Sequence, residues 1–112
     1  PLYLPQAKCF KLCAALGPCL RVAPEPPPPE TAIRLQILRA GAPAFEGETT
    51  LAQLKRTPRE LAGFLYRDNT FPAGAYLMTG TGIVPGDDFT LQSGDEMRIS
   101  IDGIGTLVNP AA

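Results

Sequence analysis

The sequence predicts a mainly β fold with one or two short helices, an α+β arrangement. In residues 97–102 apolar side chains alternate with polar ones, which is the period of a strand with one buried face. Residues 33–38 show a similar alternation. Residues 57–60 read Thr-Pro-Arg-Glu, a capping box with proline at the first helical position, which predicts a helix start. These patterns predict strands at both ends of one helix.

Length and composition limit the classes of protein to which the chain can belong. A chain of 112 residues predicts one domain, spanning residues 1–112. Apolar residues make up 45% and charged residues 19%, which is a globular balance rather than a disordered one. The net charge of −1 is spread along the chain, so neither nucleic acid nor an anionic membrane is an expected partner. No apolar stretch is long enough to span a bilayer.

The cysteines favour a reducing compartment. Cys9, Cys13 and Cys19 are odd in number and clustered, which is a poor disulfide framework. Without histidine or a CxxC motif, zinc binding is not expected, and we expect reduced thiols packed as small hydrophobic groups. This favours a cytoplasmic protein. Because the chain begins at Pro1 rather than at Met, we also expect a fragment.

The first half of the chain predicts a proline-rich loop followed by a hairpin. Residues 24–30 read PEPPPPE, which predicts an extended surface loop, with a proline ligand for an SH3-like partner as the alternative. After the strand at 33–38, residues 40–43 predict a turn and residues 44–49 the returning strand. Glu46 and Glu48 lie on one side of that strand, as a metal-binding pair would or as a solvated hairpin edge would.

The middle of the chain predicts a short helix. Leu61, Phe64 and Leu65 form an apolar stripe, and the helix is expected to end near residues 67–69. Residues 50–54 predict one further short turn. Lys55, Arg56 and Arg59 form a basic cluster, interpreted as a solvated helix start in preference to a phosphate site.

The last third carries the candidate site. Residues 75–78 predict a buried strand that ends at Thr79-Gly80-Thr81-Gly82. Glycine lets a ligand approach the main chain there, and the threonine hydroxyls can bond to it. Gly94-Asp95 predicts a turn before the strand at 97–101, and Asp102-Gly103 predicts a type I′ turn into a returning strand at 104–108.

Residues 79–110, TGTGIVPGDDFTLQSGDEMRISIDGIGTLVNP, closely resemble the C-terminal end of the fumarylacetoacetate hydrolase family. In that family a strand ends in Thr-Gly-Thr, and a loop, a "GD" turn and a strand pair reading I-x-G-I-G-x-L-x-N follow. The resemblance extends over residues 2–110. It implies that residues 1–112 are the C-terminal part of a catalytic domain with a mixed β-sandwich roll.

The resemblance also implies a chemistry. Such enzymes use Mg²⁺ or Mn²⁺ to hold a 2-oxo acid, and they act as C–C hydrolases, decarboxylases or sugar-acid dehydratases through an enolate-type intermediate. The implied catalytic residues are Lys8 and Thr81, and the implied substrate-binding residues are Thr79, Gly80 and Thr81. On composition alone Lys8 is a solvated charge. A homodimer is implied as well.

The family's metal ligands are expected before the lysine segment, in sequence that this chain lacks. Glu46 and Glu48 follow Lys8, so they do not match those ligands, and no metal ligand is assigned to this chain. We therefore expect the chain alone to bind metal poorly and to turn over little substrate. The alternatives are a non-catalytic β-rich interaction or binding module that keeps the family fold, and an independent small binding domain with only a local likeness.

Overall fold

The computed structural model describes Cys9, Lys11 and residues 13–112. Lys8 lies outside the described residues. Four strands form one antiparallel sheet in the order β2-β1-β3-β4. Their bounds are Ala32–Arg39 for β1, Ala42–Thr50 for β2, Glu96–Ile101 for β3 and Gly105–Pro110 for β4. A short 3-10 turn, η1 (Leu51–Gln53), and one helix, α2 (Pro58–Leu65), separate β2 from β3, so the predicted mainly β fold is confirmed.

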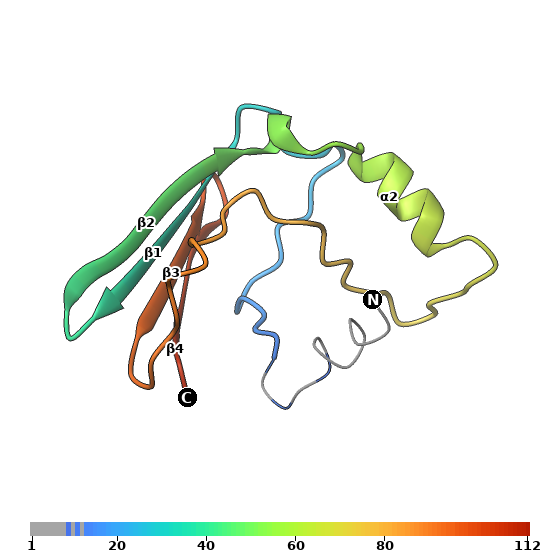
Figure 1. Ribbon diagram of the computed structural model, residues 1–112. Helices are drawn as coiled ribbons and strands as arrows, with labels where there is room; N and C mark the ends of the chain where they lie inside the picture. Colours follow the sequence, from blue (N-terminus) through green and yellow to red (C-terminus); the bar gives the residue numbers. More distant parts are fainter. Residues whose placement is uncertain (1–8, 10, 12) are drawn as a thin grey trace.

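Figure 1 shows the sheet on one side of the molecule and α2 on the other. The long segment between α2 and β3 returns across the space between them as coil (Figure 1). In the part of the chain that the structure describes, no helix combines the length and apolar character needed to cross a bilayer.

Strand β1 is central and sets the two faces of the sheet. Ile33 pairs with Thr49 of β2 and with Ile101 of β3, so these side chains share the apolar face. Ile37 on this face is 3% exposed, and together with Ala32 it forms the buried apolar core of the described residues. The alternation predicted for residues 33–38 and 97–102 therefore holds, because both strands lie side by side with their apolar residues in register.

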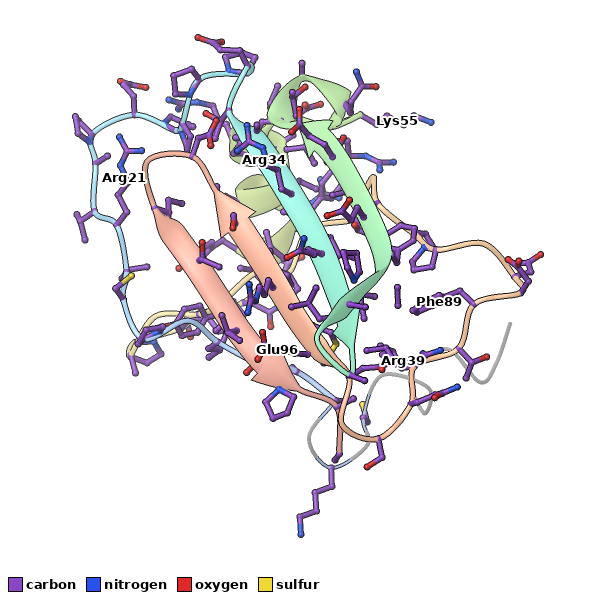
Figure 2. All side chains as sticks on the ribbon, turned by 90° about the vertical axis from the view of Figure 1, so that its left-hand side faces the viewer. Arg21, Arg34, Arg39, Lys55, Phe89 and Glu96 are labelled. Atoms are coloured by element: carbon purple, nitrogen blue, oxygen red, sulfur yellow. The ribbon has the colours of Figure 1, made fainter. Side chains whose placement is uncertain are left out.

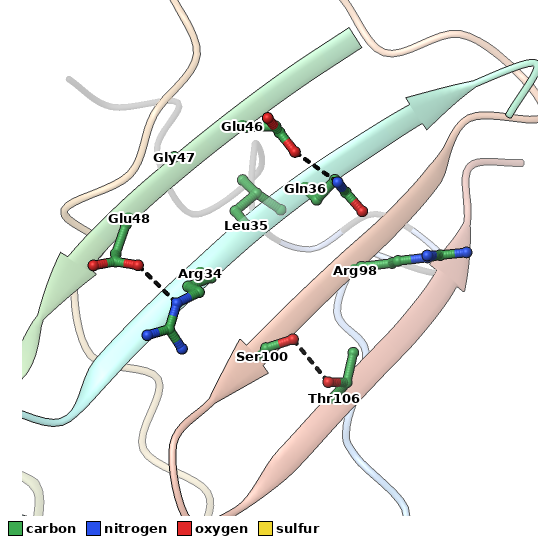
Figure 3. A pocket seen from close by; sticks show the side chains of 9 residues that line it. All are labelled: Arg34, Leu35, Gln36, Glu46, Gly47, Glu48, Arg98, Ser100 and Thr106. Atoms are coloured by element: carbon green, nitrogen blue, oxygen red, sulfur yellow. Dashed lines mark hydrogen bonds and ion pairs between the residues drawn. The ribbon is translucent and has the colours of Figure 1, made fainter. Parts of the chain in front are cut away.

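The opposite face of the sheet is polar and its charges are paired with one another. Arg34 donates from Nε to Glu48 Oε2 at 2.7 Å and from Nη1 to Asp102 Oδ1 at 2.6 Å. Gln36 donates to Glu46 Oε1 at 2.6 Å. Glu46 and Glu48 thus lie on an edge strand, each bound by a side chain of β1, as expected for a hairpin edge (Figure 3).

The first hairpin has a tighter turn than expected. Ala40 and Gly41 have φ values of 50° and 80°, which makes them the two central residues of a type I′ turn. Strand β2 therefore begins at Ala42, within the four residues expected to form the turn. The register shifts between Ile37 and Leu38, where Ala44 is the extra residue of a β-bulge.

The second hairpin forms, but the predicted type I′ turn at Asp102-Gly103 is wrong. Gly103 has a φ of 74°, whereas Asp102 does not have a positive φ. Ile101 pairs with Gly105, so the loop has three residues. The physical reason is that the Asp102 N–H donates to the Ala32 carbonyl at 3.1 Å, which holds Asp102 beside β1.

The buried strand predicted at residues 75–78 is also wrong. This segment is coil, and Tyr76 and Met78 are 68% and 71% exposed. A strand needs a hydrogen-bonded neighbour, and the sheet of the described residues ends at β2 on one side and at β4 on the other. Local apolar character alone does not supply a pairing partner.

The helix begins as predicted and ends early. The Glu60 N–H donates to Thr57 Oγ1 at 3.2 Å, and the Thr57 N–H donates to Glu60 Oε2 at 2.8 Å, which completes the capping box. The helix ends at Leu65, two residues before the predicted range. Phe64 of the apolar stripe is 56% exposed, with the Arg67 guanidinium 4.7 Å from its ring centroid.

Residues 24–30 lie in an exposed coil that is tied to η1. The Ala52 N–H donates to the Pro29 carbonyl at 2.7 Å, and the Thr31 N–H donates to the Pro28 carbonyl at 3.0 Å. The three cysteines lie in the preceding coil and are exposed. We expected the cysteines to pack as small hydrophobic groups, and this is wrong. No helix or strand of the described residues covers the segment that carries them.

Candidate functional site

A cavity of about 650 Å³ lies against the apolar face of the sheet, beside the Thr79–Gly82 turn. Its floor consists of Ile33, Ile99 and Ile101. Residues 77–82 line one part of it, and residues between Thr49 and Arg56 line another. The size falls within the range of small-molecule sites. The sheet register, the end of β2 and the segment after α2 therefore converge on one cavity.

Two glycines let the Thr79–Gly82 turn sit directly on β2. A Cβ at Gly47 of β2 would lie 2.6 Å from the Ile83 Cγ2 atom. A Cβ at Gly82 would lie 2.9 Å from the Thr49 Oγ1 atom. The glycine at each position thus allows a close approach that a side chain would prevent. Gly47 separates Glu46 from Glu48, so its role in packing was not evident from the sequence.

The two threonines of the turn differ in how their hydroxyls are used. The Ile83 N–H donates to Thr81 Oγ1 at 3.1 Å, and the same hydroxyl lies 3.2 Å from the Ile83 carbonyl, to which it donates. This closes a local side-chain turn. The Thr79 hydroxyl makes no hydrogen bond to the described residues, so it can bind a ligand without giving up a partner.

The charge of the cavity comes from Lys55 and Arg56. Both line it, and no aspartate or glutamate does. Arg59, the third member of the predicted basic cluster, is not among the lining residues. The sequence interpretation of the cluster as a solvated helix start is thus incomplete. Only the fold brings residues 55–56 and residues 79–82 to the same cavity, and no sequence spacing signals this.

Three of the candidate site residues predicted from the sequence lie at the same cavity. Thr79, Gly80 and Thr81 line the cavity together. Lys8 lies outside the described residues, so its approach to this cavity stays a prediction.

A second hollow lies on the polar face of the sheet, with a volume of about 600 Å³ (Figure 3). Its polar side chains bind one another or close neighbours. Arg98 donates to Glu96 at 2.6 Å, and the Ser100 and Thr106 hydroxyls lie 2.7 Å apart. Because these groups are already satisfied, we do not take this hollow as the functional site.

The described residues do not fit a divalent metal ion. Among Cys9, Lys11 and residues 13–112, no three histidine, cysteine, aspartate or glutamate side chains are grouped so that they could hold one. Glu46 and Glu48 are hydrogen-bonded on the face opposite the cavity. We therefore assign no chemical step to a metal held by these residues.

The described residues thus form an antiparallel sheet whose apolar face carries a cavity lined by Lys55 and Arg56 and by the Thr79–Gly82 turn. The family model described as fumarylacetoacetate (FAA) hydrolase C-terminal matches residues 2–112. The chain belongs to the fumarylacetoacetate hydrolase family. The predicted resemblance is thereby confirmed, and the alternative of an independent domain with only a local likeness is wrong.

Two curated relatives are sugar-acid dehydratases. The chain is 42% identical over 111 residues to a probable 2-keto-3-deoxyxylonate dehydratase from Haloferax volcanii, covering 97% of this chain and 38% of the relative. It is also 42% identical to the 2-dehydro-3-deoxy-D-arabinonate dehydratase from Saccharolobus solfataricus, covering 98% of this chain and 37% of the relative. The chain thus spans well under half the length of these relatives.

Solved structures of similar enzymes share the fold. A 2-keto-3-deoxy-D-arabinonate dehydratase complexed with magnesium and 2,5-dioxopentanoate superposes with a TM-score of 0.92 at 41% identity, covering 98% of this chain and 40% of that one. The apo form of such a dehydratase gives the same TM-score and identity, with 39% of its chain covered. The mainly β fold with one helix that the resemblance implied is therefore confirmed, and the sheet of the described residues is antiparallel.

Proposed function

We propose that this chain supplies the carboxylate-binding wall of a metal-dependent enzyme acting on 2-oxo acids, and that the enzyme is a 2-keto-3-deoxy sugar-acid dehydratase. The observation that carries the proposal is the Thr79–Gly82 turn, which approaches Thr49 of β2 at Gly82 and lines a cavity without acidic side chains. The dehydratase names of the similar proteins support the choice among the reactions of the family.

Within this proposal the Thr79–Gly82 turn binds the carboxylate of the 2-oxo acid. Thr79 offers a hydroxyl, Gly80 exposes its backbone, and Thr81 can turn its hydroxyl from Ile83 to the ligand. Lys8 is proposed to place an ammonium near the oxygen that gains negative charge in an enolate-type intermediate. Mg²⁺ or Mn²⁺ is proposed for the complete enzyme, with ligands outside this chain, in line with the magnesium in the similar structure.

The proposal is tested by expressing the open reading frame that contains Pro1 together with any coding sequence upstream of it, and by assaying the product on 2-keto-3-deoxypentonates and other 2-oxo acids. We expect dehydration, with Thr79→Ala and Thr81→Ala raising KM. The control is Thr106→Ala, which removes a hydroxyl from the polar face. Equal effects of all three substitutions, or no turnover of any 2-oxo acid, would contradict the proposal.

The alternative is a non-catalytic binding module that keeps the family fold. It would account equally well for the absence of grouped metal-binding side chains among the described residues. An upstream reading frame that encodes a Glu-x-Glu pair followed by an aspartate would argue against it.

We further propose that the protein is a cytoplasmic homodimer. Exposed apolar side chains such as Val22, Met78 and Val84 offer contact surface, and the cysteine-containing segment suits a reducing compartment. Light scattering coupled to size exclusion measures the mass in solution, and a monomer at micromolar concentration would contradict the dimer.

A further inference from the structure

We propose that Lys55 and Arg56 form a cationic subsite that captures the carboxylate of an anionic ligand and delivers it to the Thr79–Gly82 turn. This inference rests on the proposed function for the class of ligand, and on the geometry of the cavity for the site itself. It assigns a specificity role to two residues that the sequence interpretation left as solvent-exposed charges.

The cations that line the cavity are not balanced by acidic side chains in the lining. The lining of the cavity includes two cations and no acidic side chain, although the chain as a whole carries a net charge of −1. Although both cations are exposed and partly screened by water, no carboxylate of the lining offsets their charge. The local field in the cavity therefore favours anions over neutral molecules.

Lys55 and Arg56 differ from the arginines of the sheet in that no acidic side chain of the described residues binds them. Arg34, Arg39 and Arg98 of the sheet each bind a carboxylate at 2.9 Å or less. Within the described part of the chain, neither Lys55 nor Arg56 lies within ion-pair distance of any acidic group. Arg56 also attracts the carboxylate of Glu60, but the pKa of Glu60 is lowered mainly by its hydrogen bonds with Thr57.

Hydrogen bonds hold the backbone on both sides of Lys55 and Arg56. The Leu54 N–H donates to the Leu51 carbonyl at 3.0 Å, which closes η1 just before Lys55. The capping box at Thr57 starts α2 directly after Arg56. In Figure 2, Lys55 lies beside the η1 end of the sheet. A fixed backbone lowers the backbone entropy that this segment loses when it binds a ligand.

The two parts of the cavity lining complement each other chemically. The Thr79–Gly82 turn provides hydroxyl and backbone donors without a net charge, which give direction but little long-range attraction. Lysine and arginine provide the charge, and the arginine guanidinium can bind a carboxylate through two parallel hydrogen bonds. Together they discriminate a carboxylate from an ester or amide of the same shape.

The test is a titration of the ¹⁵N-labelled chain with three probes, namely 2-oxobutanoate, butanoate and the neutral methyl ester of 2-oxobutanoate. We expect both carboxylates, but not the ester, to shift the amide signals of residues 55–56 and 79–82. The Lys55→Gln/Arg56→Gln variant should weaken carboxylate binding about tenfold, and it should remove most of its dependence on salt. The control, Arg21→Gln/Arg59→Gln, removes the same charge outside the cavity and should stay within about twofold of wild type.

The outcomes separate the two proposals. If 2-oxobutanoate binds and the two double variants weaken it equally, or neither does, the subsite is overturned while the 2-oxo acid function stands. If butanoate binds as tightly as 2-oxobutanoate and only the Lys55/Arg56 variant weakens both, the subsite stands, and a complete reading frame that turns over no 2-oxo acid would then overturn the proposed function alone. If neither carboxylate shifts these residues, the subsite is overturned.

Discussion

Arg39 and Asp95 form a two-pronged ion pair between the end of β1 and the turn before β3. Arg39 donates from Nε to Asp95 Oδ1 at 2.9 Å and from Nη2 to Oδ2 at 2.7 Å. The Asp95 side chain is 1% exposed and also accepts from the Gln92 N–H at 2.9 Å. Arg39 in turn lies 5.7 Å from the ring centroid of Phe89, beside it at one end of the sheet (Figure 2). The pair therefore fixes residues 89–95 against the sheet.

This pair predicts how stability depends on pH. The Arg39 hydrogen bonds, followed by the Gln92 N–H, lower the pKa of Asp95 from 3.8 to about 2. Because the folded-state pKa is the lower one, the stabilisation is fully present above the unfolded value and is lost as the pH falls from 3.8 to about 2. Urea denaturation between neutral pH and pH 2 measures it.

Asp95→Asn isolates this contribution. We expect the variant to unfold at clearly lower urea concentration than wild type at neutral pH, because it leaves the Arg39 charge without its partner. The difference should shrink as the pH approaches 2, where the wild-type carboxyl also loses its charge. Asp87→Asn, in an exposed turn, is the control. A difference between Asp95→Asn and wild type that is the same at every pH would contradict the assignment to Asp95 ionisation.

Gly47→Ala should move the Thr79–Gly82 turn away from β2. The added methyl group would lie 2.6 Å from Ile83 Cγ2 and 3.3 Å from the Phe45 ring. We expect a cost of about 1–3 kcal/mol in unfolding free energy, with amide shifts in residues 79–83. Gly63→Ala is the matched control, since nothing lies within 4 Å of its new methyl group. In the helix interior that control should stabilise the protein by up to about 1 kcal/mol. Unchanged amide signals for the turn in Gly47→Ala would contradict the proposed close packing.

Thr57→Ala should destabilise α2 by about 1 kcal/mol, because it removes the side-chain cap of the Glu60 N–H. Thr57→Ser keeps the hydroxyl and should retain most of the stability. Helical circular dichroism during denaturation measures the difference. Equal losses in the two variants would show that the methyl group, rather than the cap, is what matters.

Ile37→Ala should be the costliest apolar truncation in the sheet. Ile37 is 3% exposed at the centre of β1, so we expect a loss of about 2–5 kcal/mol. Val108→Ala on β4 is the control, because its side chain is about half exposed, and it should cost much less. Denaturant unfolding of both variants makes the comparison, and similar losses would mean that the core does not centre on β1.

Local patterns of the sequence predicted the elements that depend on local chemistry. The capping box at Thr57 fixes a helix start through bonds between residues three apart. The alternation in residues 33–38 and 97–102 predicts strands because successive side chains point to opposite faces. The Thr-Gly sequence at residues 79–82 indicated a ligand-binding turn, and its resemblance to one family led to the confirmed family assignment.

Turn types and the strand expected at residues 75–78 were not predictable in this way. The type I′ turn forms at Ala40-Gly41, while at Asp102 a bond to Ala32 imposes another conformation. Residues 75–78 have the composition of a buried strand but no partner in the described sheet. Strand pairing depends on a second segment far away in the sequence, so composition alone does not settle it.

By itself, the sequence determined the family, the mainly β class, the helix start and the Thr79–Gly82 turn as a candidate site. Only the tertiary structure decided that Gly47 receives the Ile83 side chain after this turn, that Arg39 binds Asp95, and that Lys55 and Arg56 line the same cavity. The physical reason is the separation along the sequence over which each interaction acts. Capping and alternation act within a few residues, whereas a cavity and an ion pair depend on which strands pair and in which register.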